Sequence, residues 1–213
     1  MFVWGYCMDL KQLIKLHNSL GLEFTKDGLV YSIDEEGRVE ISVPEDFREE
    51  LVEILEGVTC LPTFENCQSL KKVILPGGIK KISDYCFYGC CNLKDIKISS
   101  GVTIIDEGAF LMCKSLKDIQ IPESVSNIND IAFLGCLDLR SVSLSEGLYR
   151  IEFRSFAYCT SLTNITIPRS VCSIGKEAFT HCDSLFHVSL PKHLKEFIPL
   201  AFDNEADINF EFY

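Results

Sequence analysis

Cysteine and histidine are the residue types in this chain best suited to chemistry, because both bind metals and both act in catalysis. The 213-residue sequence holds eleven cysteines and four histidines. His181, His187 and His193 fall in one stretch, but the pattern around them predicts a turn, a strand and a segment beyond a proline. The cysteines include no C-x-x-C pair with zinc-site spacing. We therefore expect no metal site and interpret these histidines as surface polar residues.

Enzymatic function has little support in the sequence. Catalysis needs a nucleophile, a base and an orienting group that converge in one pocket. The chain contains no glycine-rich phosphate loop, nucleophile elbow or zinc-protease motif. We predict that it is not an enzyme and that it carries no cofactor.

An internal repeat organises most of the chain. Phenylalanine stands three residues before each of six regularly spaced cysteines, and leucine three residues after each. Two pairs of apolar residues follow in every unit, aliphatic except for Phe197 in the last, and each pair predicts a short extended segment. A constant period of about 20 to 50 residues is typical of a solenoid, in which each unit buries its apolar face against its neighbours. The period here is 23 residues, and the cysteines are Cys67, Cys90, Cys113, Cys136, Cys159 and Cys182.

These six cysteines are predicted to form a ladder. Stacked coils lie about 4.8 Å apart, which is within disulfide range, but parallel side chains in a ladder point the wrong way for a disulfide bond. Free cysteine packs as a small buried residue, so we interpret the ladder as reduced core packing. Reduced thiols in this number favour a cytosolic or anaerobic setting.

Composition and charge exclude several classes of protein. The formal net charge of −11 argues against direct binding to nucleic acid through phosphate neutralisation. Charged residues interrupt every apolar run, so no membrane span is expected. The N-terminus lacks the basic and apolar regions of a signal peptide, which favours a cytoplasmic location. A mature fragment of a cell-surface protein would look the same.

The ends of the chain depart from the repeat, which divides it into three parts. Residues 1–60 hold 13 acidic and 5 basic residues, a net charge of −8, and predict an acidic α+β cap. Within it we expect a helix at 8–20, a hairpin of 29–33 with 39–43, and a second helix after Pro44. Residues 61–204 form the solenoid, and residues 205–213 predict a capping strand around Ile208, Phe210 and Phe212.

The repeat unit closely resembles the BspA-type leucine-rich repeat. The segment Cys-Lys-Ser-Leu-Lys-Asp-Ile-Gln-Ile-Pro-Glu-Ser-Val-Ser-Asn-Ile, at 113–128, followed by Ala132 and Phe133, matches that repeat nearly letter for letter. The resemblance extends from Phe64 to Phe202. It implies a right-handed solenoid with a parallel sheet on its concave side. It also implies a role similar to that of surface adhesins and host-interaction proteins of anaerobic bacteria and protists.

Candidate binding residues are those that should point outward from the strands, because a repeat scaffold has no chemistry of its own. Basic side chains occupy one position in four successive units, and coils about 4.8 Å apart would set them in a row. Such a row is either a solvated face or an electropositive strip for an acidic partner. Ile74, Tyr149, Phe153 and Tyr158 are further candidates for interface anchors. The proposed partner-binding residues are Lys71, Lys94, Lys117, Arg140, Lys72, Lys97, Phe186 and His187.

Three functions fit these features. The first is a protein-binding module that docks a macromolecular partner on a solenoid face. The second is an acidic inhibitor or decoy that blocks a nucleic-acid-binding protein through the acidic residues of 34–50. The third is a structural segment of a surface adhesin. The partner and the oligomeric state do not follow from the sequence.

Overall fold

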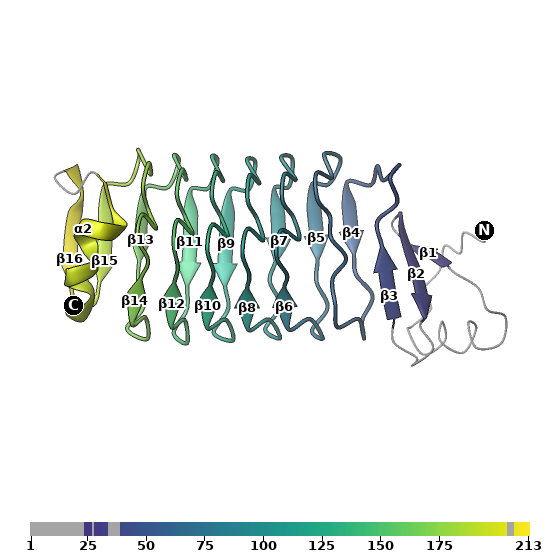
Figure 1. Cartoon of the computed structure of the whole chain (residues 1–213), viewed down its shortest axis with the longest axis horizontal. Helices are drawn as coiled ribbons and strands as arrows, with labels where there is room; N and C mark the ends of the chain where they lie inside the picture. The colour runs from purple at the N-terminus through teal and green to yellow at the C-terminus, as the bar shows by residue number, and fades with distance from the viewer. Residues whose placement is uncertain (1–23, 27, 34–38, 204–206) are drawn as a thin grey trace.

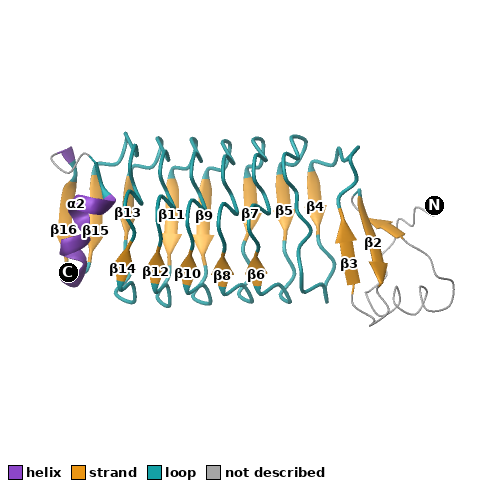
Figure 2. Cartoon of the chain, viewed as in Figure 1, coloured by secondary structure: helices purple, strands orange, loops and turns teal. Residues whose placement is uncertain are grey.

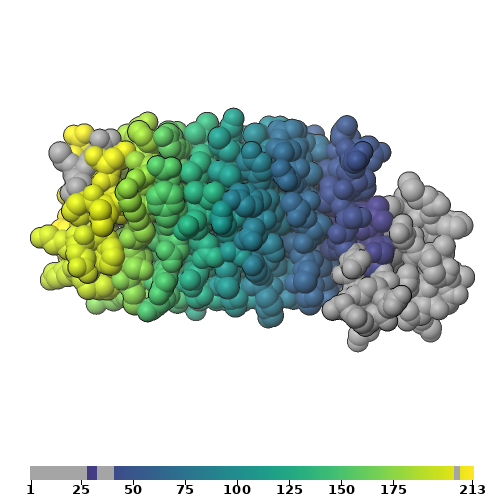
Figure 3. Space-filling view, in the orientation of Figure 1, coloured from purple at the N-terminus to yellow at the C-terminus, as the bar shows by residue number. Residues whose placement is uncertain are grey.

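The computed structural model describes residues 24–26, 28–33, 39–203 and 207–213 of the chain. From residue 51 onward the chain winds as a stack of coils along the long axis of the molecule, from blue through green to yellow in Figure 1. The space-filling view in Figure 3 shows the same order of colours along the surface. Figure 2 shows that strands and loops make up nearly all of this stack, with helix near its C-terminal end only. The predicted repeat solenoid is confirmed.

Each coil contributes one strand to a ladder of parallel strands along one side of the stack. Val73 pairs with Ile96, and Ile119 with Val142, so neighbouring strands are related by one repeat. The outermost partner is the last strand, which pairs with the strand before it. The strands of this first ladder form three hydrogen-bonded groups that follow one another along the stack. They are β4 (Leu51–Glu53), β5 (Lys72–Ile74) and β7 (Asp95–Lys97), then β9 (Asp118–Ile121) and β11 (Ser141–Leu144), and then β13 (Asn164–Thr166), β15 (His187–Leu190) and β16 (Asn209–Phe212).

The second pair forms a short strand in five of the six units, and these strands make a second parallel sheet. The extended segment predicted for the sixth unit is wrong, because Leu194 and Phe197 lie in a 3₁₀ helix that follows β15. The second sheet joins Ile105 to Ile82 on one side and to Ile128 on the other, again one repeat apart. The strands are β6 (Lys81–Ile82), β8 (Ile104–Ile105), β10 (Asn127–Ile128), β12 (Arg150–Ile151) and β14 (Ser173–Ile174).

A column of stacked phenylalanine rings runs through the core. The rings of neighbouring coils lie 4.9 to 5.4 Å apart between centroids, with planes within 9° of parallel. Each ring is buried, as are the aliphatic side chains that point inward from both ladders. Because the period is constant, each apolar side chain meets its own equivalent in the next coil. The column consists of Phe64, Phe87, Phe110, Phe133, Phe156, Phe179 and Phe202.

The cysteine ladder lies beside this column, at the turn of each coil. The buried thiols of five coils each donate a hydrogen bond to the phenylalanine carbonyl oxygen of the preceding coil, with S···O distances of 3.0 to 3.4 Å. Burial raises the pKa of Cys90 and of Cys182 to about 12, so both thiols stay protonated at neutral pH and can donate. The ten described cysteines are free thiols. The ladder therefore packs in the core and also satisfies a backbone carbonyl in each turn.

The N-terminal cap is partly as predicted. β2 (Leu29–Ile33) and β3 (Val39–Ser42) pair antiparallel and confirm the hairpin, and β1 (Phe24–Lys26) adds a third strand. The predicted helix at 8–20 lies outside the described residues. The predicted helix after Pro44 is wrong, because the chain makes a turn there and then forms β4.

The first ladder explains why β4 replaces a helix. Val52 and Ile54 are buried while Leu51 and Glu53 are exposed, which is the alternation of a strand. β4 pairs with β5, so the parallel stack offers its side chains a core that an isolated helix would lack. The helix start signals at Pro44 and Glu45 are outweighed by this pairing. The solenoid ladder thus begins inside the segment that the sequence assigns to the cap.

The C-terminal end closes the stack. A 3₁₀ helix at Lys192–Phe197 and the short helix α2 (Ile198–Ala201) follow β15, and β16 then pairs parallel with β15, which confirms the predicted final strand. Asp203 accepts hydrogen bonds from the Thr180 hydroxyl and the His181 backbone N–H, both at 2.9 Å. Its carboxylate thereby supplies an acceptor that another coil would otherwise provide.

Candidate functional site

The predicted binding residues lie on the outward side of the first ladder, which we call the strand face. Lys71, Lys94, Lys117 and Arg140 each stand directly before a strand, and we call this set the cation column. Backbone hydrogen bonds join the first two members and the last two, from Lys94 N–H to the Lys71 carbonyl at 2.8 Å and from Arg140 N–H to the Lys117 carbonyl at 2.7 Å. The structure therefore sets these four side chains in successive coils on one face.

Ion pairs divide the basic residues of the strand face into two groups. Lys71 pairs with Glu50, and Lys72 pairs with Asp95, each at 2.5 Å between nitrogen and oxygen. The others, Lys94, Lys97, Lys117 and Arg140, form no ion pair with any described residue. A pair at the surface adds little stability, but it neutralises the charge that a partner would meet. The free positive charge of the face is thus concentrated over β7, β9 and β11.

A shallow groove of about 760 Å³ opens beside these free charges, at the ends of β5, β7 and β9. Lys72 and Lys97 line it together with the half-buried side chain of Ile74. Its other lining residues include Gln120 and Ser99. Asp95 also lines the groove, so an apolar side chain is surrounded by polar and charged groups, as in the apolar centre and polar rim of a protein interface.

At the C-terminal end of the strand face, one exposed aromatic side chain stands next to a cluster of polar side chains on β15 and β16. Phe186 is 59% exposed, the highest value among the large hydrophobic residues that the structure describes. The adjacent His187 lies 3.2 Å from the Ser189 hydroxyl through Nε2 and 3.2 Å from the Asn209 amide through Nδ1. Ser189 donates its hydroxyl proton to Glu211 at 2.9 Å rather than to His187. A serine nucleophile needs the histidine as its proton acceptor, so this cluster is a polar link between β15 and β16.

The remaining exposed aromatic residues lie away from the strand face. The guanidinium of Arg150 lies over the Tyr149 ring, and that of Arg154 lies over the Phe153 ring, at 5.4 and 4.9 Å from the ring centroids. Tyr158 packs against the His181 ring at 4.5 Å between centroids. The structure therefore separates these predicted anchors from the cation column.

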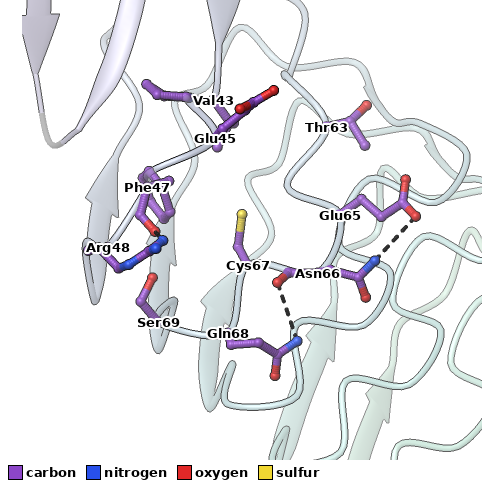
Figure 4. A pocket seen from close by; sticks show the side chains of 11 residues that line it. Val43, Glu45, Phe47, Arg48, Thr63, Glu65, Asn66, Cys67, Gln68 and Ser69 are labelled. Atoms are coloured by element: carbon purple, nitrogen blue, oxygen red, sulfur yellow. Dashed lines mark hydrogen bonds between the residues drawn. The ribbon is translucent and has the colours of Figure 1, made fainter.

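A second opening was not predicted from the sequence. It is a cleft of about 630 Å³ between the cap and the first regular turn, which we call the first-turn cleft (Figure 4). Val43, Phe47 and Arg48 line one wall, and the turn at 63–69 lines the other. Cys67 lies on the second wall, and burial raises the pKa of its thiol. The sequence contains one indication of this cleft: Cys67 is the first cysteine of the ladder, and no regular repeat precedes it.

Neither a metal cluster nor a membrane-spanning helix is found among the described residues. No group of three or more histidine, cysteine, aspartate or glutamate side chains in the described part of the chain is placed to hold a metal ion. Within the same residues, no helix is long and apolar enough to cross a membrane.

Comparison with known proteins places this geometry among leucine-rich repeats. A family model described as "BspA type Leucine rich repeat region" matches residues 60–159 and 128–211, in six copies. No curated protein matches the sequence significantly.

Solved structures share the fold. A leucine rich cell surface protein from Faecalibacterium prausnitzii A2-165 matches with a TM-score of 0.69 and 28% identity, over 82% of this chain and 55% of its own. The T. pallidum leucine rich repeat protein TpLRR matches with a TM-score of 0.57 and 24% identity, over 85% and 98% of the two chains. The pneumococcal vaccine antigen PcpA reaches 0.69 at 18% identity, over 90% and 47%. The chain thus spans about half the length of the first and third of these structures.

Proposed function

This chain belongs to the family of BspA-type leucine-rich repeat proteins, and we propose that it acts as a non-enzymatic module that docks a protein partner on its strand face. The observation that carries this proposal is the set of free cations over β7, β9 and β11, next to the groove around Ile74. Lys94, Lys117 and Arg140 meet no acidic partner within the described residues. An acidic surface would supply the missing countercharges.

The partner is proposed to be a protein rather than a nucleic acid. The net charge of −11 opposes the approach of a phosphate polymer, whose affinity depends on the number of cations that neutralise it. Ile74 and Phe186 also add apolar contact area, which protein partners use at the centre of an interface. At physiological salt, a fluorescent duplex DNA should therefore show no binding to the wild-type chain.

Charge reversal tests the strand face. We would compare the wild type with the triple variant Lys94→Glu, Lys117→Glu and Arg140→Glu in pull-downs from extracts of the organism that encodes the chain. The matched control reverses three exposed lysines elsewhere, Lys80, Lys114 and Lys192, so that net charge changes equally. We expect the strand-face variant to lose a partner that the control retains, with both variants melting at the wild-type temperature. If both variants capture the same proteins as the wild type, the strand face is not the docking site.

A role in surface adhesion is the second candidate. It is favoured by the similar structure from F. prausnitzii, which is described as a cell surface protein. The free thiols support the other location that the sequence suggests, a reducing compartment. Protease treatment of intact cells separates the two, since a surface protein is degraded and an internal one is protected.

A further inference from the structure

The turns of the solenoid are joined by a repeating set of three hydrogen bonds. Phe110 N–H donates to the Ala132 carbonyl at 2.7 Å, and Met112 N–H donates to the Leu134 carbonyl at 2.8 Å. In return, the Cys136 thiol donates to the Phe110 carbonyl at 3.3 Å. Each turn therefore presents two acceptor carbonyls and one donor thiol toward its N-terminal neighbour, and the neighbour satisfies all three.

The first turn presents the same three groups without such a neighbour. The equivalents of the two carbonyls are those of Thr63 and Glu65, and the equivalent of the thiol is that of Cys67. None of these three groups has a hydrogen-bond partner among the described residues. The other ladder cysteines are buried, whereas Cys67 is only half-buried. The turn ladder is thus open at its N-terminal end.

The cap extends the first ladder and the ring column but leaves the turn ladder open. β4 continues the first strand ladder, and the Phe47 ring lies 6.2 Å from the Phe64 ring, edge-on, at the end of the ring column. The cap wall at Val43–Arg48 stands away from the first turn, and the first-turn cleft lies between them. Figure 4 shows the Cys67 thiol directed into the space between these walls. The volume of about 630 Å³ lies within the range of protein ligand sites.

We propose that the first-turn cleft binds an extended segment of a partner polypeptide, which completes the turn ladder. Two of its backbone N–H groups donate to the carbonyl oxygens of Thr63 and Glu65, and one of its carbonyl oxygens accepts from the Cys67 thiol. This is strand addition applied to a turn ladder, in which main-chain hydrogen bonds provide affinity and side chains provide selectivity. The site is separate from the strand face, and neither proposal depends on the other.

The walls define the side chains that the segment carries. Phe47 already occupies the ring position, so the residue that replaces a phenylalanine of the ladder must be small. Val43 and Phe47 offer apolar contact, whereas the exposed carboxylates of Glu45 and Glu65 stand at the cleft. Arg48 is engaged at 2.7 Å with the backbone carbonyl of Phe47. A neutral or basic segment with a small central residue fits these groups better than an acidic one.

The chain itself provides a probe of the right shape. In residues 129–137, the N–H groups of Phe133 and Gly135 donate to the following coil, and the Phe133 carbonyl accepts from the next thiol. We would synthesise this nonapeptide with Phe133→Ala, to leave room for Phe47, with Cys136→Ser, to prevent oxidation, and with Asp130→Asn, to remove its acidic side chain. The matched control peptide is methylated on the two donor nitrogens, which removes both donors and keeps the sequence.

The peptide would be titrated into the ¹⁵N-labelled full chain, and amide chemical shifts would be followed. We expect saturable shifts in residues 63–69, and binding at least about 10-fold weaker for the methylated peptide, since each lost hydrogen bond is worth about 1 kcal/mol. Cys67→Ala should weaken binding several-fold, and Cys67→Ser, which keeps a donor, should retain it. The strand-face triple variant should bind the peptide like the wild type.

Three results would overturn the proposal. One is the absence of saturable shifts up to about 5 mM peptide, since a dissociation constant above that concentration is too weak for a specific site. Another is equal binding of the methylated and unmethylated peptides. The third is a set of shifts centred on β16 instead of the first turn, which would place the peptide on the sheet edge at the other end of the stack.

Discussion

Truncation of one ring in the phenylalanine column should destabilise the whole stack. The Phe133 ring is fully buried, with neighbouring rings at 5.0 Å on the Phe110 side and 5.1 Å on the Phe156 side. Replacing a buried phenylalanine by alanine costs about 3–5 kcal/mol. We expect a loss in the upper half of this range, because removing the ring breaks two stacked pairs, and each such pair adds about 0.5–1.5 kcal/mol to stability. For a chain of this size, a loss of about 4 kcal/mol lowers the melting temperature by about 8–16 °C.

Urea unfolding, followed by circular dichroism, measures this effect. Phe133→Ala would be compared with Phe186→Ala, which removes the same side chain from an exposed position and should change stability by about 0.5 kcal/mol or less. The slope of the free energy against urea should stay unchanged, so that the shift in midpoint reports stability alone. Equal midpoints for the two variants, or a cost below about 2 kcal/mol for Phe133→Ala, would refute the idea that the ring column holds the coils together.

Three further predictions concern the turns and ends of the stack. At about pH 8, iodoacetamide should modify the exposed thiol of Cys172 rapidly but the thiol of Cys136 only as the chain unfolds. The reason is that burial raises the pKa of Cys136 and so suppresses its reactive thiolate form. Equal rates of modification, measured by mass spectrometry, would contradict a buried ladder. Gly101→Ala should lower the free energy of unfolding in urea by more than about 2 kcal/mol, because its Cβ would clash with the Gly77 carbonyl oxygen of the preceding coil. Gly77→Ala is the control, since its Cβ meets open space and the change should be nearly neutral. Similar losses for the two variants would argue against tight contact between these coils. Burial alone would raise the pKa of Asp203, but the hydrogen bonds to its carboxylate lower that pKa overall. The charged carboxylate therefore stabilises the fold at any pH above the ordinary aspartate pKa. This contribution is lost as the pH falls through the pKa of Asp203 in the folded chain. Asp203→Asn should therefore melt below the wild type at pH 7 and together with it near about pH 2, and a difference that persists in acid would exclude this cause.

The regular part of the fold could be predicted from the sequence because the period is constant. With a shift of 23 residues, Val73 and Ile96 must occupy equivalent environments, and the same holds for every ring and thiol of the two core columns. A single assignment of inward and outward positions therefore applies to six units. The sequence also indicated which basic residues share a column, since Lys94 and Lys117 stand at one position of the unit.

The parts of the fold that could not be predicted depend on contacts between the irregular N-terminal segment and the regular repeats. Pro44 and the acidic residues after it carry valid helix signals, and only the neighbouring strand β5 shows that Val52 is needed in a ladder. The pairing of Lys71 with Glu50 has the same origin, because it joins an irregular segment to the first regular coil. Local patterns contain no information about such contacts.

The two candidate sites arise from opposite departures from regularity. On the strand face, the core positions repeat while the outward positions vary, so a partner can be recognised by Lys94, Lys117 and Arg140 without any cost to packing. In the first-turn cleft, the sequence at 63–67 keeps the turn pattern but its structural neighbour is missing, so groups that are satisfied in the five later coils with a ladder cysteine remain open. A change in the first site should alter which partner binds and leave stability intact. A ligand that binds only the folded chain should raise its melting temperature at either site, so the control peptide must show which hydrogen bonds are responsible. A rise in melting temperature that the nonapeptide gives and its methylated control does not, and that the strand-face triple variant keeps, therefore identifies a ligand that extends the turn ladder.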